Sequence, residues 1–206
     1  MLPTFLVSGG PLVWLLMLVG AVSFVVFLER VLIYHREQIN CTEFLSGVRN
    51  VLKRDNIVEA ISICDATPGP VARMVKVAIL NRDTGRTRIQ AVLAETGAVE
   101  VPRLEEKLSI LATAAQIAPL LGLLGTVLAM LGMFGVMQRQ GMAIHPYDFA
   151  RHLYGGLCTT AMGLAVAIIN YAAYNYLVRR VDSIVLDMEK AAAEVLNALT
   201  ENSRTP

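Results

Sequence analysis

The stretch LYGGLCTTAMGLAVAIIN, residues 153–170, decides the fold of this chain. It contains no Asp, Glu, Lys or Arg, so it suits the interior of a lipid bilayer. It is also rich in glycine, alanine and threonine and ends in Asn170, a composition that contact with lipid does not require. Small and polar residues in a membrane helix typically face another helix or a cavity. We therefore expect a membrane helix that turns one face away from lipid.

Two further runs, 1–28 and 108–138, also lack charged residues. Each exceeds the roughly 20 residues that a helix needs to cross a bilayer. Of the 206 residues, 55% are hydrophobic and 17% are charged, against about 25% charged in a soluble domain. The sequence predicts an all-α integral membrane protein with long cytoplasmic helical extensions and three transmembrane helices, at 11–34, 108–137 and 153–177. The net charge of +1 gives no sign of a nucleic-acid partner.

The first apolar run differs from a signal peptide in two ways. Residues 1–10 contain no Lys or Arg, and the run from Pro11 to Leu28 is longer than the apolar region of a typical signal peptide. We expect a membrane helix that is retained.

Basic residues predict the orientation of the three helices. The segment 30–107 contains twelve Lys and Arg, whereas residues 1–10 contain none. Because basic residues favour the cytoplasmic side, we expect a periplasmic tail at 1–10, a cytoplasmic helical region at 35–107, a periplasmic loop at 138–152 and a cytoplasmic amphipathic helix and tail at 178–206.

Three features predict helices in the cytoplasmic region. Asn56 followed by Glu59 resembles a capping box that begins a helix at 57–66. Thr87 with Gln90 is expected to begin a long helix that continues through 104–107 into the second membrane helix. Apolar residues recur with a helical period along 178–200, which indicates an amphipathic helix that needs a partner surface.

The second and third membrane helices each carry small and hydroxyl side chains at helical spacing. The pattern has two interpretations: close packing of helices, or a polar path for an ion or a partner's charged side chain. The two interpretations are compatible. The residues concerned are Gly122, Gly125, Thr126, Ala129 and Gly132 in the second helix, and Gly156, Thr159, Thr160, Gly163, Ala167 and Asn170 in the third.

Two motifs in these helices resemble a known family. APLLGLLGTV at 118–127, followed by TTAMGLAVAI at 159–168, is similar to the ExbB/TolQ/MotA proton-channel family. The sequence LER at 28–30, the three-helix topology and the cytoplasmic segment between the first two helices extend the likeness. The ExbB and TolQ branches fit better than MotA, which is longer and has four membrane helices.

The resemblance implies a stator subunit of the bacterial inner membrane, driven by the proton-motive force. In such proteins five copies surround single-span partners of the ExbD/TolR type, and the complex energises a periplasmic effector such as TonB or TolA, for example in outer-membrane nutrient uptake. The proton-carrying aspartate belongs to the partner. The family's two pore threonines correspond to Thr126 and Thr160, and Thr159 adjoins them. A hydroxyl suits a water wire because it both donates and accepts hydrogen bonds.

One position departs from the family pattern. Where ExbB and TolQ have a glutamate five residues before the threonine of the third helix, this chain has Gly155. Either the partner's aspartate carries protons with only hydroxyls and water around it, or Tyr154 and Asn170 replace the missing polar group. Coupling to another ion such as sodium, and a membrane scaffold without conduction, remain open alternatives. A secondary transporter would usually need more spans or an inverted repeat.

Other residues carry no expected chemistry. The sequence contains no catalytic triad, phosphate loop or metal-ligand cluster, so we expect neither an enzyme nor a cofactor. Cys41, Cys64 and Cys158 are interpreted as packing residues. We expect His145 and His152 to be solvated and the methionines at 130, 133, 137 and 142 to pack rather than bind metal.

Overall fold

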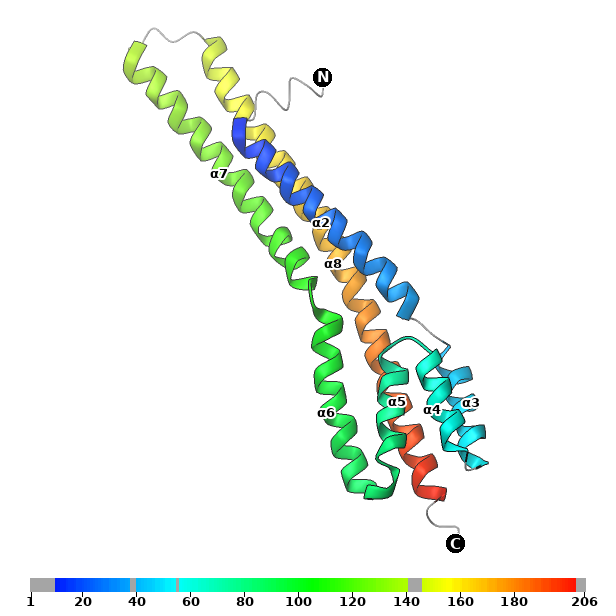
Figure 1. Cartoon of the computed structure of the whole chain (residues 1–206). Coiled ribbons are helices and arrows are strands. Elements are labelled where there is room, and N and C mark those ends of the chain that lie inside the picture. The colour runs from blue at the N-terminus through cyan, green and yellow to red at the C-terminus, as the bar shows by residue number, and fades with distance from the viewer. Residues whose placement is uncertain (1–9, 38–39, 55, 141–145, 203–206) are drawn as a thin grey trace. The chain divides into compact units, whose positions relative to one another are not determined.

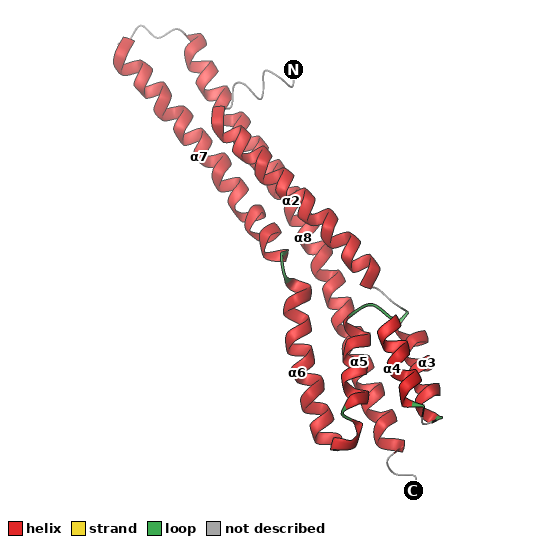
Figure 2. Cartoon of the chain, in the orientation of Figure 1, coloured by secondary structure: helices red, strands yellow, loops and turns green. Residues whose placement is uncertain are grey.

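A computed structural model describes residues 10–37, 40–54, 56–140 and 146–202, and every regular element within them is a helix (Figures 1 and 2). This confirms the predicted all-α class. In chain order the elements are α2 (Gly10–Glu37), α3 (Cys41–Lys53), α4 (Ile57–Ala66), α5 (Pro70–Leu80), the 3₁₀ helix η1 (Arg82–Thr84), α6 (Arg86–Glu105), α7 (Leu108–Gln140) and α8 (Pro146–Asn202).

Three of these helices are long and apolar enough to cross a membrane, as predicted. The most apolar 18-residue windows in α2, α7 and α8 have mean hydropathies of 2.5, 2.2 and 1.5. Large apolar side chains such as Trp14, Phe24, Leu123 and Ile168 are more than half exposed along these helices. Such side chains suit contact with lipid, because the interior of a bilayer is itself apolar.

The chain divides into two compact units. The apolar unit consists of residues 1–29 and 107–176, and the charged unit of residues 30–106 and 177–206. In the apolar unit, Leu16 of α2, Ala118 of α7 and Ala167 of α8 form a small buried core against which Leu121, Met162 and Val166 pack. Two of these three core residues are alanines, and their small side chains let the helices of this unit lie close together.

The charged unit has a larger core, in which branched apolar side chains are frequent. α3, α4, α5 and α6 contribute buried residues such as Leu45, Cys64, Val75 and Ile89. The second half of α8 adds the apolar stripe expected at 178–200: Val181, Ile184, Met188 and Val195 are all buried. The predicted partner surface of this amphipathic helix is therefore the core of the charged unit.

The structure corrects two expectations about helix boundaries. The long helix expected from Thr87 into the second membrane helix is interrupted, because Glu106 has an extended ψ of 139° and Lys107 a positive φ of 66°. That backbone cannot continue a run of i→i−4 hydrogen bonds. The predicted 138–152 loop is also partly helical, since α7 reaches Gln140 and α8 begins at Pro146. Proline suits the first turn of a helix, where its missing N–H has no partner to lose.

The helix predicted at 57–66 is confirmed as α4. The Asn56 side chain accepts a hydrogen bond from the Glu59 backbone N–H at 3.4 Å and donates one to the Glu59 carboxylate at 2.7 Å. Asn56 therefore satisfies a donor of the first turn that the helix itself leaves unpaired.

Candidate functional site: the small-residue seam of α7 and α8

Helices α7 and α8 meet along a seam of very small side chains. We call this contact the small-residue seam and define it by Ala118, Gly122, Gly125, Thr126 and Ala129 of α7 and Gly156, Thr159, Thr160 and Gly163 of α8. A Cβ atom placed on Gly122 would lie 3.0 Å from the Thr160 Cα and 3.3 Å from the Gly163 Cα. A Cβ on Gly163 would lie 2.5 Å from the Ala118 carbonyl oxygen. The two backbones are thus in direct contact, which only glycine permits here.

The seam continues toward the end of α7 through two further glycines. A Cβ on Gly125 would overlap the Thr159 side chain, and one on Gly156 would lie 3.0 Å from the Ala129 Cβ and 3.1 Å from the Thr126 Cα. The glycines of one helix therefore receive the threonines and alanine of the other. The packing interpretation accounts for the spacing of these residues.

The three threonine hydroxyls of the seam differ in what they bond and in how exposed they are. The Thr160 hydroxyl donates across the seam to the Gly122 carbonyl at 2.9 Å. Thr159 and Thr126 donate within their own helices, to the Gly156 and Leu123 carbonyls at 2.7 and 2.6 Å. Thr159 is only 2% exposed, whereas Thr126 and Thr160 are partly exposed at the edges of the seam. Of these three threonines, only Thr126 and Thr160 are accessible to a molecule outside this chain.

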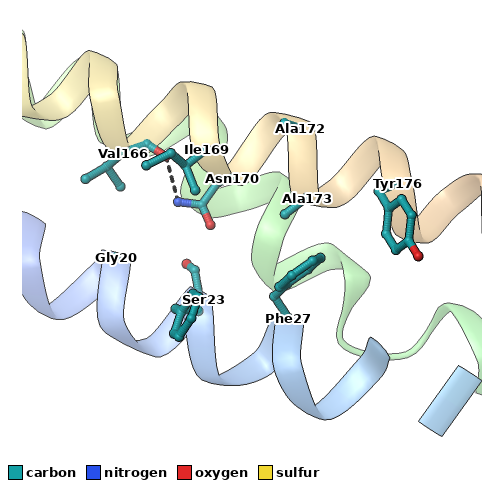
Figure 3. Close-up of a pocket in the computed structure, with 10 residues that line it drawn as sticks. Gly20, Ser23, Phe27, Val166, Ile169, Asn170, Ala172, Ala173 and Tyr176 are labelled. Carbon is teal, nitrogen blue, oxygen red and sulfur yellow. Dashed lines mark hydrogen bonds between the residues drawn. The ribbon is translucent and has the colours of Figure 1, made fainter. Parts of the chain in front are cut away.

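Asn170 lies apart from these threonines, in a groove between α2 and α8. Figure 3 shows its side chain pointing toward α2, where Ser23 faces it. Asn170 is 4% exposed and donates to the Val166 carbonyl at 2.8 Å, and Ser23 donates to the Val19 carbonyl at 2.8 Å. The groove has a volume of about 500 Å³ and is otherwise mostly apolar; Phe27 and Tyr176 also line it, with their rings edge to face and centroids 6.3 Å apart. Ser23 was not predicted as a site residue, although a hydroxyl within a predicted membrane helix was the available signal.

The remaining candidates lie at the start of α8 and nearby. Tyr154 is exposed, and Gly155, the position of the family glutamate, is buried and lines a cavity with His152 and Thr159. Gly132 faces the His152 ring, since a Cβ there would lie 3.5 Å from its Cδ2. Ala167 belongs to the core with Leu16. His145 and Met142 lie outside the described residues.

The seam contains no carboxylate. The sequence of α7 has no Asp or Glu, and neither does α8 from Phe149 to Tyr176. Glu29 of α2 forms an ion pair with Lys107, with Oε1 and Nζ 2.5 Å apart. A hydroxyl or amide cannot bind and release a proton near neutral pH. The seam therefore supplies no titratable carboxylate from α7 or from residues 149–176 of α8.

The charged unit contains the best-formed ion pair among the described residues. Arg73 donates to both carboxylate oxygens of Glu100, at 2.8 and 2.7 Å, and Glu100 is 7% exposed. The hydrogen bond to Glu100 raises the pKa of Arg73 above its ordinary value. Burial raises the pKa of the Cys64 thiol to about 11, so this residue stays a protonated packing group. All three cysteines are free thiols.

Comparisons with known proteins agree with this architecture. The sequence model of the MotA/TolQ/ExbB proton channel family matches residues 66–190, which include the whole seam. An ExbB homolog of Methanothermobacter thermautotrophicus, named for biopolymer transport, is 26% identical over 183 residues, or 88% of this chain and 64% of the relative. The biopolymer transport protein ExbB of Aquifex aeolicus is 41% identical over 91 residues, or 44% of this chain and 61% of the relative. The matches thus span less than two thirds of either relative.

Proposed function

The chain belongs to the MotA/TolQ/ExbB proton channel family, and from this premise we propose that it is an inner-membrane stator subunit driven by the proton-motive force. In this proposal five copies form a pore around single-span partners of the ExbD/TolR type. Proton flow through the pore moves the complex and energises a periplasmic effector of the TonB or TolA kind, as in outer-membrane nutrient uptake. The N-terminus is periplasmic and the C-terminus cytoplasmic.

The absence of a carboxylate from the seam sequence carries the mechanistic part of the proposal. Thr126 and Thr160 are partly exposed at the seam edges, so their oxygens can contact water or a neighbouring chain. The group that binds and releases the proton is then an aspartate of the partner helix, and the threonines orient water around it. Each proton that crosses the membrane contributes about 2.3 kcal/mol per 100 mV of potential.

Burial separates the five predicted path residues into two groups. Thr126, Thr160 and Tyr154 are at least partly exposed, which supports a place on the path. Thr159 and Asn170 are 2% and 4% exposed and bond to their own helix, which supports a packing role. We therefore assign conduction to Thr126, Thr160 and Tyr154 alone.

The test is proton uptake by vesicles that contain this chain together with a single-span partner carrying an intramembrane aspartate. We expect uptake that is lost when the partner's aspartate is replaced by asparagine. Thr160→Val should lower uptake by about tenfold, since a lost hydrogen bond of about 1.4 kcal/mol in the transition state has that effect. Thr160→Ser should retain it.

The matched control is Thr159→Val, which removes a neighbouring hydroxyl that lies inside the seam. Uptake should be unchanged in that variant. Equal loss in Thr159→Val and Thr160→Val, with the complex still assembled, would contradict the assignment. Ion uptake that depends on sodium rather than on a pH gradient would mean that sodium, not the proton, is the coupling ion. If the assembled complex showed no ion flux at all, a membrane scaffold would be favoured.

A further inference from the structure

The apolar unit contains a second cavity whose walls differ from those of the α2–α8 groove. It has a volume of about 520 Å³ and is lined by residues from all three helices of the unit. α8 contributes Arg151, His152 and Thr159, while Gly125 and Gly155 leave parts of the wall without side chains. An exposed guanidinium and a half-buried imidazole thus border one space between helices that are otherwise apolar, whereas the Thr159 hydroxyl donates to the Gly156 carbonyl of its own helix.

The lining of the cavity extends along the axis of α8. Arg151 and Thr159 are eight residues apart, which corresponds to about 12 Å at 1.5 Å per residue. On α7 the cavity reaches Gly125, fourteen residues before Arg139 or about 21 Å along that helix. The cavity therefore reaches far into the segments that are apolar enough to span a membrane.

A cavity of this size and polarity is suited to water. A water molecule occupies about 30 Å³ in the liquid and needs two to four polar partners in a protein. The α2–α8 groove is of similar volume, but its polar side chains Ser23 and Asn170 are 2% and 4% exposed, whereas Arg151 of the second cavity is exposed and His152 half-buried. The two spaces thus differ in chemistry rather than in size.

We propose that this second cavity is a water-filled vestibule that opens at the end of the apolar unit where α7 ends and α8 begins. Arg151 stands at its mouth and Thr159 at its inner wall. The vestibule runs inside a single subunit, between α2, α7 and α8. The role of the vestibule as the route by which water reaches the seam rests on the function proposed above. The presence of water in the vestibule does not depend on that function.

Cysteine labelling in intact membranes tests this proposal. In full-length chain with Cys41, Cys64 and Cys158 replaced by alanine, Leu12→Cys and Leu128→Cys place a thiol on the vestibule wall. A membrane-impermeant anionic methanethiosulfonate reacts with the thiolate, which forms only in contact with water. Both variants should be modified when the reagent is added from the side on which the vestibule opens.

Two control variants place a thiol at exposed positions that do not line the vestibule. Leu15→Cys lies one turn from Leu12, and Leu15 is 43% exposed but lines no described cavity; Ile169→Cys lies in the apolar groove, and Ile169 is 65% exposed. Neither should react, although both native side chains have large exposed fractions. Modification of all four variants, or of none, would overturn the proposal.

Arg151 at the mouth gives a second measurement. Because a guanidinium attracts anions, Arg151→Gln should lower the labelling rate of Leu128→Cys by the anionic reagent several-fold relative to a cationic one. If the ratio of the two labelling rates were unchanged in Arg151→Gln, Arg151 would not lie at the mouth of the vestibule. Labelling requires neither the partner nor a proton gradient, so a labelled vestibule in a complex without proton uptake would contradict only the proposed function.

Discussion

The apolar and charged units of this chain are held together by different physical means. In the apolar unit, glycines bring the α7 and α8 backbones into contact and a threonine hydroxyl bonds across the seam. In the charged unit, branched side chains fill a core and Arg73 holds a buried carboxylate. In lipid, apolar burial gives helices little reason to associate, so close packing has to replace it. Different kinds of substitution should therefore destabilise the two units.

The largest effect is expected from a side chain added to the seam. In Gly163→Ala the new Cβ would lie 2.5 Å from the Ala118 carbonyl oxygen and 3.0 Å from the Gly122 Cα, both backbone atoms that cannot rotate away. Separating the helices also strains the Thr160 hydrogen bond. We expect at least the upper end of the about 1–3 kcal/mol typical of overpacking. Thermal unfolding of the detergent-solubilised chain should show a lowered midpoint.

Gly135→Ala is the matched control for that experiment. Gly135 lies in α7, the other helix of the seam, but no atom beyond its own helix backbone lies within 4 Å of a Cβ built on it. This variant should keep or slightly raise the midpoint, because alanine favours helix over glycine by up to about 1 kcal/mol. Equal destabilisation by both variants would mean that the seam is not what holds α7 to α8.

The next largest effect is expected in the charged unit. Arg73→Ala leaves the Glu100 carboxylate buried without its cation, a change that typically costs about 3 kcal/mol or more. Hydrogen exchange in α5 and α6 should then accelerate on the order of a hundredfold, since 1.4 kcal/mol corresponds to tenfold. Exchange in the seam should change less.

The pair Lys76–Asp65 provides the control for Arg73. Its atoms are 2.5 Å apart, but the Asp65 side chain is 56% exposed. Lys76→Ala should therefore cost less than about 1 kcal/mol. If Lys76→Ala accelerated exchange as much as Arg73→Ala, burial of Glu100 would not be the cause. The double variant Arg73→Met with Glu100→Met should recover part of the loss.

The sequence predicted helices and apolar stripes well because both depend on local periodicity. Charge-free runs located the three long helices, Asn56 and Glu59 located the start of α4, and the stripe from Val181 to Val195 is buried as expected. The break at Lys107 was not predicted, because its neighbours have no proline or glycine and a positive φ in lysine has no sequence signal.

The candidate site was predicted only in outline. Helical spacing grouped Thr159, Thr160 and Asn170 on one face of α8, and the structure shows that Thr159 and Asn170 are buried. Helical spacing alone could not predict that Thr160 bonds to α7 whereas Asn170 faces Ser23 of α2. The reason is that α7 and α2 pack against different parts of this face of α8. The choice of partner depends on tertiary packing, which one helix's periodicity does not contain.

Cys64 gives a smaller and pH-dependent prediction for the charged unit. Burial raises the pKa of its thiol from 9.0 to about 11, so the folded chain holds this proton more tightly than the unfolded chain. The resulting stabilisation is fully present below pH 9 and is lost as the pH rises toward 11. Denaturant unfolding at pH 8 and pH 10.5 should show this loss, and Cys64→Ala should reduce it. An identical pH dependence in both proteins would contradict the assignment.

The smallest effects are expected at the break between α6 and α7, where Lys107 combines a positive φ with the Glu29 ion pair. Glu29→Gln removes the charge from an ion pair whose side chains are about two-fifths exposed, which should cost less than about 1 kcal/mol. Lys107→Gly removes the same pair but relieves a left-handed conformation that costs an L-residue about 1–2 kcal/mol. Lys107→Gly should therefore unfold at a temperature equal to or above that of Glu29→Gln, and Lys107→Val should unfold below both, because a β-branched residue tolerates this φ least. If Lys107→Val were as stable as Lys107→Gly, residue 107 would not need a positive φ, and α6 and α7 could form the continuous helix that the sequence suggested.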